Sequence, residues 1–351
     1  MTRTDRPTLA DVAAAAGVSV STASLAFSGA GPVAAATRER ILATAAELGY
    51  LGPNPMARSL RRGRSGVIAV VVGNELRRAF SDPVLTQTLD GVAQELGARG
   101  LGLLLVPSDQ FTDVPTLIRE GAMDAAIIAG LAEWSDPLLE ALRARGVPLV
   151  RLDAGPQDAA GIGIEDRAGM AQIGRHVTGL GHTRIGLLTL PLGHRRRTRL
   201  IDPVDPGPMA FTPTSNRWAG LRDAGIVATS AAEAASSVVE EGMSAARLLL
   251  APPDRPTALI AFSDLLAAGA VIAARELGLR VPQDLSVAGF DGLDLPWLAP
   301  DELTTATQPL IEKGRFTARA AAALARGEAT AYASLPVGLR IGTTTGPPPV
   351  A

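Results

Sequence analysis

The first residues that could carry chemistry form a run of small hydroxyl side chains near the start of the chain. They are Ser19, Ser21, Thr22 and Ser24, with Val20 among them. On one edge of a helix, hydroxyls of this size can hydrogen-bond base edges or phosphates, and they let the helix enter a major groove closely. A helix that only filled a core would not need such a polar edge.

Familiar catalytic patterns are absent from the sequence. There is no Cys, which excludes thiol nucleophiles, disulfides and thiolate metal sites, and three His are too few for a His-rich metal cage. No G-x-S-x-G elbow, P-loop, H-E-x-x-H or G-x-G-x-x-G motif occurs. We therefore expect a chain that is not an enzyme and that carries no cofactor or metal.

Local signals predict the helices that position the hydroxyls. Thr8 is expected to cap a helix over residues 9–16, and Gly17 then supplies a tight turn. Ser19 is expected to cap a second helix, which ends at Ser28-Gly29. Helix, glycine turn and second helix form a helix-turn-helix unit. Any small three-helix bundle could share this pattern, so the polar edge of the second helix decides the interpretation.

A third helix is predicted to complete this small domain, residues 1–50. Thr37 is its expected cap, and Gly49 closes it. Its apolar face is expected to consist of Ile41, Leu42, Ala45 and Leu48.

The charge distribution supports a polyanionic partner for the first part of the chain. The whole chain has a formal net charge of −2, yet residues 1–65 hold eight Arg against four acidic residues. Such asymmetry suggests that residues 1–65 bind a polyanion, although a solvated basic linker would have the same charge distribution. There is neither a signal-peptide pattern nor a run of about 18 apolar residues, so we expect a soluble cytoplasmic protein without membrane contact.

The remainder, residues 66–351, alternates between strand-like and helical segments. Strand-like runs include residues 67–72, 101–106, 125–129, 147–152, 185–190, 259–262 and 285–289. Strands that alternate with helices imply parallel sheets with right-handed crossovers. The alternation occurs in two successive series along the chain. We therefore predict two doubly wound α/β lobes, with ligands bound in the cleft at the carboxyl ends of their strands.

The segment from Thr8 to Gly29, TLADVAAAAGVSVSTASLAFSG, and the following TRERILATAAELGYLGPNPMARSLRRGRSGVIAVVV resemble the start of a LacI/GalR-family repressor. The resemblance extends over nearly the whole chain. It implies an all-α headpiece and a periplasmic-binding-protein-like core crossed by three strands. It also implies that Val20 and Ser21 read bases and that Thr22 holds phosphate. Leu25 stands where many members have a basic or polar residue, so one expected contact with the operator is absent.

A hinge is predicted over residues 51–65. Asn54 could cap a short helix that begins at Pro55, and such a short helix is marginal alone in water. The resemblance implies that this segment folds on the operator, with Ala57 and Arg58 on the facing turn and Leu60 wedged into the minor groove. A Leu between arginines suits a bent minor groove.

Polar residues at predicted strand or helix ends match the family's effector contacts. The resemblance implies such a role for Asp153, Arg217, Asp264, Asp291 and Gln308. It further implies an N-lobe of residues 66–163 and 308–336, and a C-lobe of residues 164–307 and 337–346. For each carboxylate, helix capping or turn formation is the alternative role. Phe80 and Trp218 remain as candidates to stack on a ligand, together with Trp134 and Trp297.

Residues 193–213 depart from the family, which has a short loop there. This stretch holds several Arg and then several Pro, and we expect it to be long and structureless. It could bind an anionic effector or be a mobile surface excursion, and we favour the excursion.

These observations together predict a sequence-specific DNA-binding transcriptional regulator. The resemblance implies a repressor that forms a homodimer on a near-palindromic duplex and responds to a small molecule, with a carbohydrate as the family expectation. The alternative is a cytoplasmic small-molecule-binding α/β protein or enzyme without DNA binding. That alternative leaves residues 1–65 unexplained.

Overall fold

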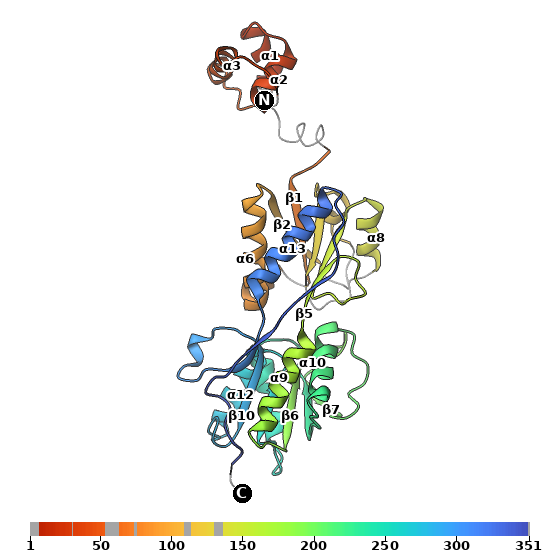
Figure 1. Cartoon of the computed structure of the whole chain (residues 1–351), viewed down its shortest axis with the longest axis vertical. Coiled ribbons are helices and arrows are strands. Elements are labelled where there is room, and N and C mark those ends of the chain that lie inside the picture. Colours follow the sequence, from red (N-terminus) through yellow and green to blue (C-terminus); the bar gives the residue numbers. More distant parts are fainter. Residues whose placement is uncertain are drawn as a thin grey trace, which may run out of the picture. The chain divides into compact units, whose positions relative to one another are not determined.

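The computed structural model describes residues 7–29, 31–52, 63–73, 76–108, 114–129 and 136–349. The chain divides into two compact units, Met1–Gly66 and Val67–Ala351. We call the described part of the first unit the head and that of the second unit the body (Figure 1). Each is described by itself.

The head contains the helices α1 (Leu9–Ala15), α2 (Val20–Ser28) and α3 (Ala35–Glu47). Thr8 caps α1 in a capping box, in which the Asp11 carboxylate accepts the Thr8 backbone N–H at 2.8 Å. Ser19 caps α2, and Gly29 ends it with a φ of 68°. These local predictions are confirmed.

Two predictions for the third helix are wrong. The helix begins at Ala35, and its N-cap Ala34 provides no side-chain hydrogen bond, so Thr37 is not the cap. Alanines are the strongest helix formers, which explains the earlier start. Only Ile41 and Ala45 of the expected apolar face are buried, whereas Leu42 and Leu48 are about two-fifths exposed. Two short neighbouring helices cover only a narrow stripe of α3.

The N-lobe of the body is built on a six-stranded sheet in the order β12-β5-β4-β3-β1-β2. Every pair in it is parallel. The strands are β1 (Val67–Gly73), β2 (Gly102–Ser108), β3 (Ala125–Ala129), β4 (Leu149–Leu152), β5 (Gly161–Ile164) and β12 (Ala333–Leu335).

Helices cover both faces of this sheet. The helices are α5 (Arg78–Ser81), α6 (Pro83–Ala98), α7 (Thr116–Glu120), α8 (Asp136–Ala144) and α13 (Leu310–Ala325). Alternate residues of β1 enter two separate cores: Ile68 and Val70 pack with residues of α6 and α13, whereas Ala69 and Val71 pack with residues of α7 and α8. A strand buried on both faces explains the unbroken apolar run in this part of the sequence.

The C-lobe is built on a seven-stranded sheet in the order β13-β11-β10-β9-β6-β8-β7. Its edge pairs β7–β8 and β11–β13 are antiparallel and the other pairs are parallel. The strands are β6 (Ile185–Thr189), β7 (Arg199–Ile201), β8 (Ser230–Glu233), β9 (Ala258–Ala261), β10 (Ser286–Asp291), β11 (Thr304–Thr307) and β13 (Gly338–Arg340).

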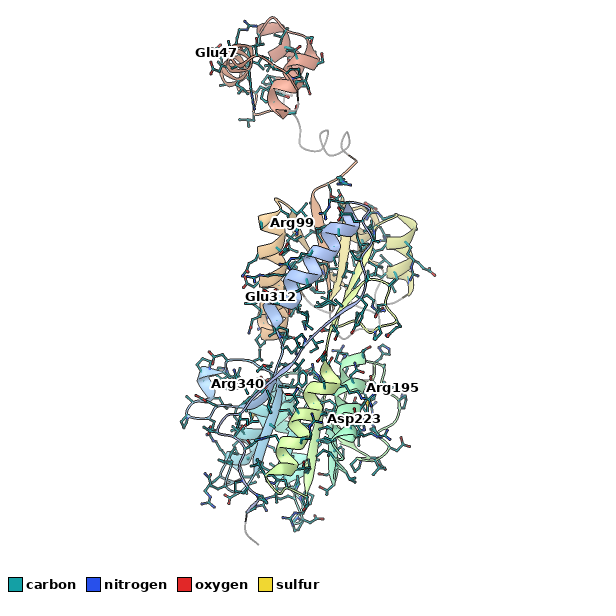
Figure 2. All side chains as sticks on the ribbon, in the orientation of Figure 1. Glu47, Arg99, Arg195, Asp223, Glu312 and Arg340 are labelled. Atoms are coloured by element: carbon teal, nitrogen blue, oxygen red, sulfur yellow. The ribbon has the colours of Figure 1, made fainter. Side chains whose placement is uncertain are left out.

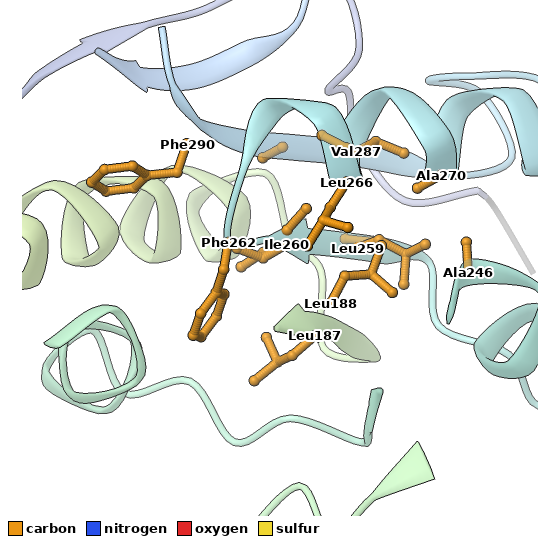
Figure 3. Packing of buried hydrophobic residues seen from close by; sticks show 14 of the residues in the cluster. Leu187, Leu188, Ala246, Leu259, Ile260, Phe262, Leu266, Ala270, Val287 and Phe290 are labelled. Carbon is orange, nitrogen blue, oxygen red and sulfur yellow. The ribbon is translucent and has the colours of Figure 1, made fainter. Parts of the chain in front are cut away.

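Four long helices flank the C-lobe sheet: α9 (Asp166–Gly179), α10 (Thr212–Asp223), α11 (Val239–Leu250) and α12 (Asp264–Glu276). A short 3-10 helix, η1, spans Pro296–Leu298. Leu187, Ile260 and Phe262 belong to the hydrophobic core shown in Figure 3.

The predicted pair of doubly wound lobes is confirmed by this topology. The chain passes between the lobes three times, after β5, after β11 and after β12 (Figure 1). The prediction that residues 193–213 lack structure is wrong, because β7 lies within them and pairs with β8. The sequence signal for β7 is only three residues long, and its partner strand lies far along the chain.

Among the described residues, no single helix has the length and hydropathy of a membrane span. The helices α1 and α2 together have the required length and hydropathy, but neither has them alone, and the two helices are bent by 107° relative to one another.

Candidate DNA-binding helix and ligand cleft

The polar edge of α2 lies on the outside of the head. Ala23 and Ala26 are buried in the head core, while Val20 is 49% exposed and Ser21 is exposed. Thr22 and Ser24 are half-buried, and Leu25 is 37% exposed. The predicted base-reading and phosphate-binding positions therefore share an accessible surface.

Hydrogen bonds among the hydroxyls hold this edge in place. The Ser19 Oγ accepts the Thr22 backbone N–H at 3.1 Å and lies 2.8 Å from both the Ser21 Oγ and the Thr22 Oγ1. Thr8 is exposed at the start of α1. A helix start with exposed hydroxyls and backbone N–H groups is suited to phosphate oxygens.

The predicted hinge lies outside the described residues, and with it the expected cap Asn54, which is also a candidate DNA contact, and the expected contacts Ala57, Arg58 and Leu60. Trp134 also lies outside them.

A cavity of about 150 Å³ lies between the two lobes of the body. It opens where the strand order of each sheet reverses: Gly73 and Ala129 end β1 and β3, while Leu190 and Ser263 follow β6 and β9. The crevice at such a switch point is the usual ligand site of a doubly wound sheet. The polar lining residues are Asp82, Thr88, Asp153, Arg196, Arg217, Ser236, Ser237, Ser263, Asp291, Gln308 and Lys313.

A chain of polar contacts runs through this cavity. The Lys313 Nζ donates to the Asp153 Oδ1 and to the Gln308 Oε1, each at 3.0 Å. The Gln308 Nε2 in turn donates to the Asp291 Oδ1 at 2.6 Å. Because Asp153 directly follows the N-lobe strand β4 and Asp291 ends the C-lobe strand β10, this chain of contacts links the two lobes.

Arg217 continues the chain into the C-lobe. Its Nε donates to the Asp166 Oδ1 at 2.7 Å, and its Nη1 lies 3.7 Å from the Asp291 Oδ1. The Nη1 also donates to the Phe262 carbonyl oxygen, and the guanidinium stacks 3.8 Å from the centre of the Phe290 ring. Arg217 is only 5% exposed, so its orientation is fixed by these partners.

Burial raises the pKa values of the acidic groups around Arg217. It raises the pKa of Asp291 to about 8, helped by the nearby charges of Asp264 and Asp82 and opposed by Arg217. Burial likewise raises the pKa of Asp264 to about 6. It also raises the pKa of Asp166, against the attraction of Arg217. Asp291 therefore retains a proton at a pH at which an exposed carboxyl would have lost it.

Local backbone features place the cleft residues. Asp153 has a φ of 54° and Asp291 a φ of 137°, both unusual for residues other than glycine. Gly314 lets α13 approach α6, because a Cβ at this position would lie 2.0 Å from the Thr88 carbonyl oxygen. The adjacent Lys313 is thereby held at the cavity with only 1% of its surface exposed.

The structure brings together four of the seven predicted effector positions: Asp153, Arg217, Asp291 and Gln308 line the cavity. The other three do not line it. Phe80 is 69% exposed on α5, and Trp218 packs into the C-lobe core beside Phe262. Asp264 is fully buried, and its Oδ2 accepts the Leu293 backbone N–H at 2.7 Å. Asp264 is not the cap of α12, which is Ser263, and its role in effector binding stays a prediction.

Several lining residues were not predicted. Among them, Ser236 and Ser237 follow β8, which the strand pattern did not reveal. Lys313 is the only Lys in a chain rich in Arg, and this rarity was the signal that could have drawn attention to it. Within the described residues, no group of three or more His, Asp or Glu could hold a metal ion.

A helix-turn-helix head and a two-lobed body with a cleft at its switch points define a class of ligand-responsive DNA-binding regulators. Residues 8–54 match the model of the lacI family of bacterial regulatory proteins, and residues 175–345 match a periplasmic-binding-protein-like domain. The chain is 35% identical to an HTH-type transcriptional regulator of Mycobacterium tuberculosis over 98% of both proteins. It is 32% identical to the HTH-type transcriptional regulator IpsA of Corynebacterium glutamicum over 88% of both.

Solved structures agree with this match. The lac repressor dimer bound to operator and the anti-inducer ONPF has a TM-score of 0.80 and 26% identity, with 97% of this chain and 100% of that chain covered. The complex of the transcriptional regulator CelR with cellobiose has a TM-score of 0.67 and 25% identity, with 97% of this chain and 100% of that chain covered. The chain belongs to the lacI family. It is a DNA-binding transcriptional regulator, which confirms that prediction and the exclusion of an enzyme.

Proposed function

We propose that the protein is a cytoplasmic repressor that forms a homodimer on a near-palindromic operator and is controlled by a small molecule in the cleft. The exposed polar edge of α2 supports the first part, since it combines small hydroxyls with an accessible helix start. Val20, Ser21 and Ser24 would meet base edges, and Thr8, Ser19 and Thr22 would meet phosphates. Leu25 would lie against the same groove.

The buried Arg217 beside Asp291 is the observation that carries the effector part of the proposal. A fixed guanidinium and carboxyl at a cavity can bind the vicinal hydroxyls of a sugar or sugar derivative. Asp153 and Gln308 would complete these contacts from the other side. A ligand that binds one lobe arrangement better than another would shift operator affinity through a coupling of typically about 1–3 kcal/mol.

Selection of duplex DNA from a random pool by the full chain tests the operator part. We expect an enriched near-palindrome whose binding falls by at least about 100-fold in Ser21→Asp, because a carboxylate would face the negative duplex. Ala43→Asp, at an exposed position on α3, is the matched control and should bind nearly as the unchanged protein does. Failure to enrich any duplex would refute the operator part of the proposal.

Thermal-shift screening against sugars, sugar phosphates and nucleosides tests the effector part. A hit should raise the unfolding temperature of the unchanged protein and change operator affinity. The shift should be lost in Arg217→Ala. A shift that survives this substitution would place the effector elsewhere.

A further inference from the structure

The two walls of the cleft differ in their chemistry. The C-lobe wall supplies Arg196, Arg217, Ser236, Ser237 and Ser263, with Asp291 as its single carboxyl. The N-lobe side supplies Asp82, Asp153, Thr88, Lys313 and, at the crossing after β11, Gln308. The C-lobe wall is therefore dominated by hydrogen-bond donors and positive charge, while the N-lobe side presents two carboxylates.

The loop that carries Arg196 is fixed to the C-lobe sheet at both ends. Glu233 of β8 is 1% exposed, and its carboxylate accepts the Leu192 backbone N–H and the Arg199 Nε, each at 2.8 Å. Thr198 accepts the Ala235 backbone N–H at 3.0 Å and donates to Glu241. Arg196 thus lines the cavity from a loop that hydrogen bonds hold against the C-lobe sheet. We therefore no longer favour the interpretation of this stretch as a mobile surface excursion.

Other features of the C-lobe wall favour negative charge. The helix α10 begins at this wall, where Pro213 lines the cavity, and its N-terminus has no side-chain cap. The positive end of its dipole adds to the field of the arginines. Asp291 has its pKa raised to about 8 by burial, so this carboxyl is mostly neutral at pH 7 and repels an anion little. Ser236 offers a hydroxyl donor nearby, and the Ser237 Oγ donates to the Ser263 Oγ at 2.8 Å, which leaves the Ser263 hydroxyl hydrogen for a ligand.

We propose that the ligand of the cleft is a polyol with an anionic group, a phosphate or a carboxylate. Arg196, Ser236 and Ser263 would hold the anionic group on the C-lobe wall, and Asp153 would accept hydroxyls on the N-lobe side. This inference rests on the proposed function of the cleft as the effector site and narrows its ligand class. Among the described residues that line the cavity, none is aromatic.

Thermal unfolding of the full chain with inorganic phosphate tests this inference, with chloride at matched ionic strength as the reference. Ribose 5-phosphate against ribose, and gluconate against glucose, distinguish a phosphate from a carboxylate group. We expect phosphate to raise the unfolding temperature in a saturable way and the anionic member of at least one pair to bind more tightly. Arg196→Gln should weaken the binding of the anionic probe by at least about tenfold, as loss of a charge-assisted hydrogen bond does.

Arg195→Gln is the matched control, because Arg195 is exposed on the same loop and does not line the cavity (Figure 2). It should bind the anionic probes as the unchanged protein does. The inference is overturned if no anionic probe gives a saturable shift, if the neutral member of each pair binds as tightly, or if both variants lose binding equally. A neutral sugar that binds through Arg217 would keep the proposed function and refute only this inference, whereas absence of any selected duplex would refute only the operator part.

Discussion

The head and the cleft, the two functional regions of this regulator, are assembled in opposite ways. In the head, Thr8 caps α1, Ser19 caps α2, and the exposed hydroxyls follow within the next turns of the same helix. In the cleft, the ion pair between Lys313 and Asp153 joins residues 160 positions apart. Arg217 and its partner Asp166 are 51 positions apart.

This difference determines what each region depends on. The head needs its caps and a small core of its own, whereas the cleft needs two complete lobes in register. Since the two units are compact by themselves, we expect that a substitution can unfold either unit without unfolding the other. All three Trp lie after residue 66 in the sequence, so tryptophan fluorescence reports on the body alone.

Arg217→Met should give the largest loss, about 3–5 kcal/mol of body stability, because it leaves the buried Asp166 without its partner. Chemical denaturation followed by tryptophan fluorescence measures it. Arg167→Met is the matched control: its ion pair with Asp223 is 2.5 Å long but exposed, so its loss should leave body stability nearly unchanged. Equal losses in the two variants would show that burial does not decide the strength of these pairs.

Ile41→Ala should destabilise the head and leave the stability of the body unchanged. Ile41 is fully buried in the small head core, and such a truncation costs about 2–5 kcal/mol, a large share of the stability of a domain of this size. We expect fast amide exchange over residues 9–47 and loss of duplex binding, with an unchanged tryptophan unfolding curve. A parallel fall in body stability would contradict the independence of the two units.

The same difference explains how much the sequence could predict. Thr8, Ser19 and Gly29 act on neighbours within a few residues, so the helix boundaries they set could be read directly. Asp153, Arg217, Asp291 and Gln308 reach the cavity as the family resemblance implied. Trp218 could not be placed in advance, because nothing local distinguishes a side chain that faces the core from one that faces the cavity.

The unpredicted part of the cleft depends on long-range pairing. The position of Arg196 follows from the buried Glu233, which binds both sides of its loop from a neighbouring strand. No periodicity within residues 193–213 encodes that contact. In the head, the failure at Thr37 had a different origin, since two competing local signals, a cap residue and preceding alanines, were both present.

Asp291→Asn should change how body stability depends on pH. With a pKa raised from 3.8 to about 8, Asp291 is still largely protonated in the folded body at pH 7 and loses its proton as the pH approaches 8, whereas after unfolding it is already ionised above about pH 5. The stability it contributes is therefore lost as the pH rises, with a slope of at most about 1.4 kcal/mol per pH unit. Burial lowers the pKa of His176 and His182, so neither group titrates strongly in this window.

Tryptophan-detected denaturation of the unchanged protein should show this fall between pH 7 and 8, and Asp291→Asn should flatten it. Asp284→Asn is the control, because the exposed Arg280 holds the pKa of Asp284 below its usual range and this carboxyl does not titrate there. Identical slopes for the unchanged protein and Asp291→Asn would place the raised pKa on another group.

The smallest expected effect lies at the cap of α1, and it separates folding from DNA contact within the head. Thr8→Ala removes one half of the capping box and should cost about 1 kcal/mol, which corresponds to about fivefold faster amide exchange over residues 9–15. Thr8→Ser retains the hydroxyl that accepts the Asp11 N–H, so exchange should stay as it is. If Thr8 also holds a phosphate, Thr8→Ala should weaken duplex binding by more than the loss of head stability accounts for, and Thr8→Ser should not. If duplex binding by Thr8→Ala falls by no more than the loss of head stability explains, while amide exchange is faster as expected, Thr8 acts as the cap alone and is removed from the proposed DNA contacts.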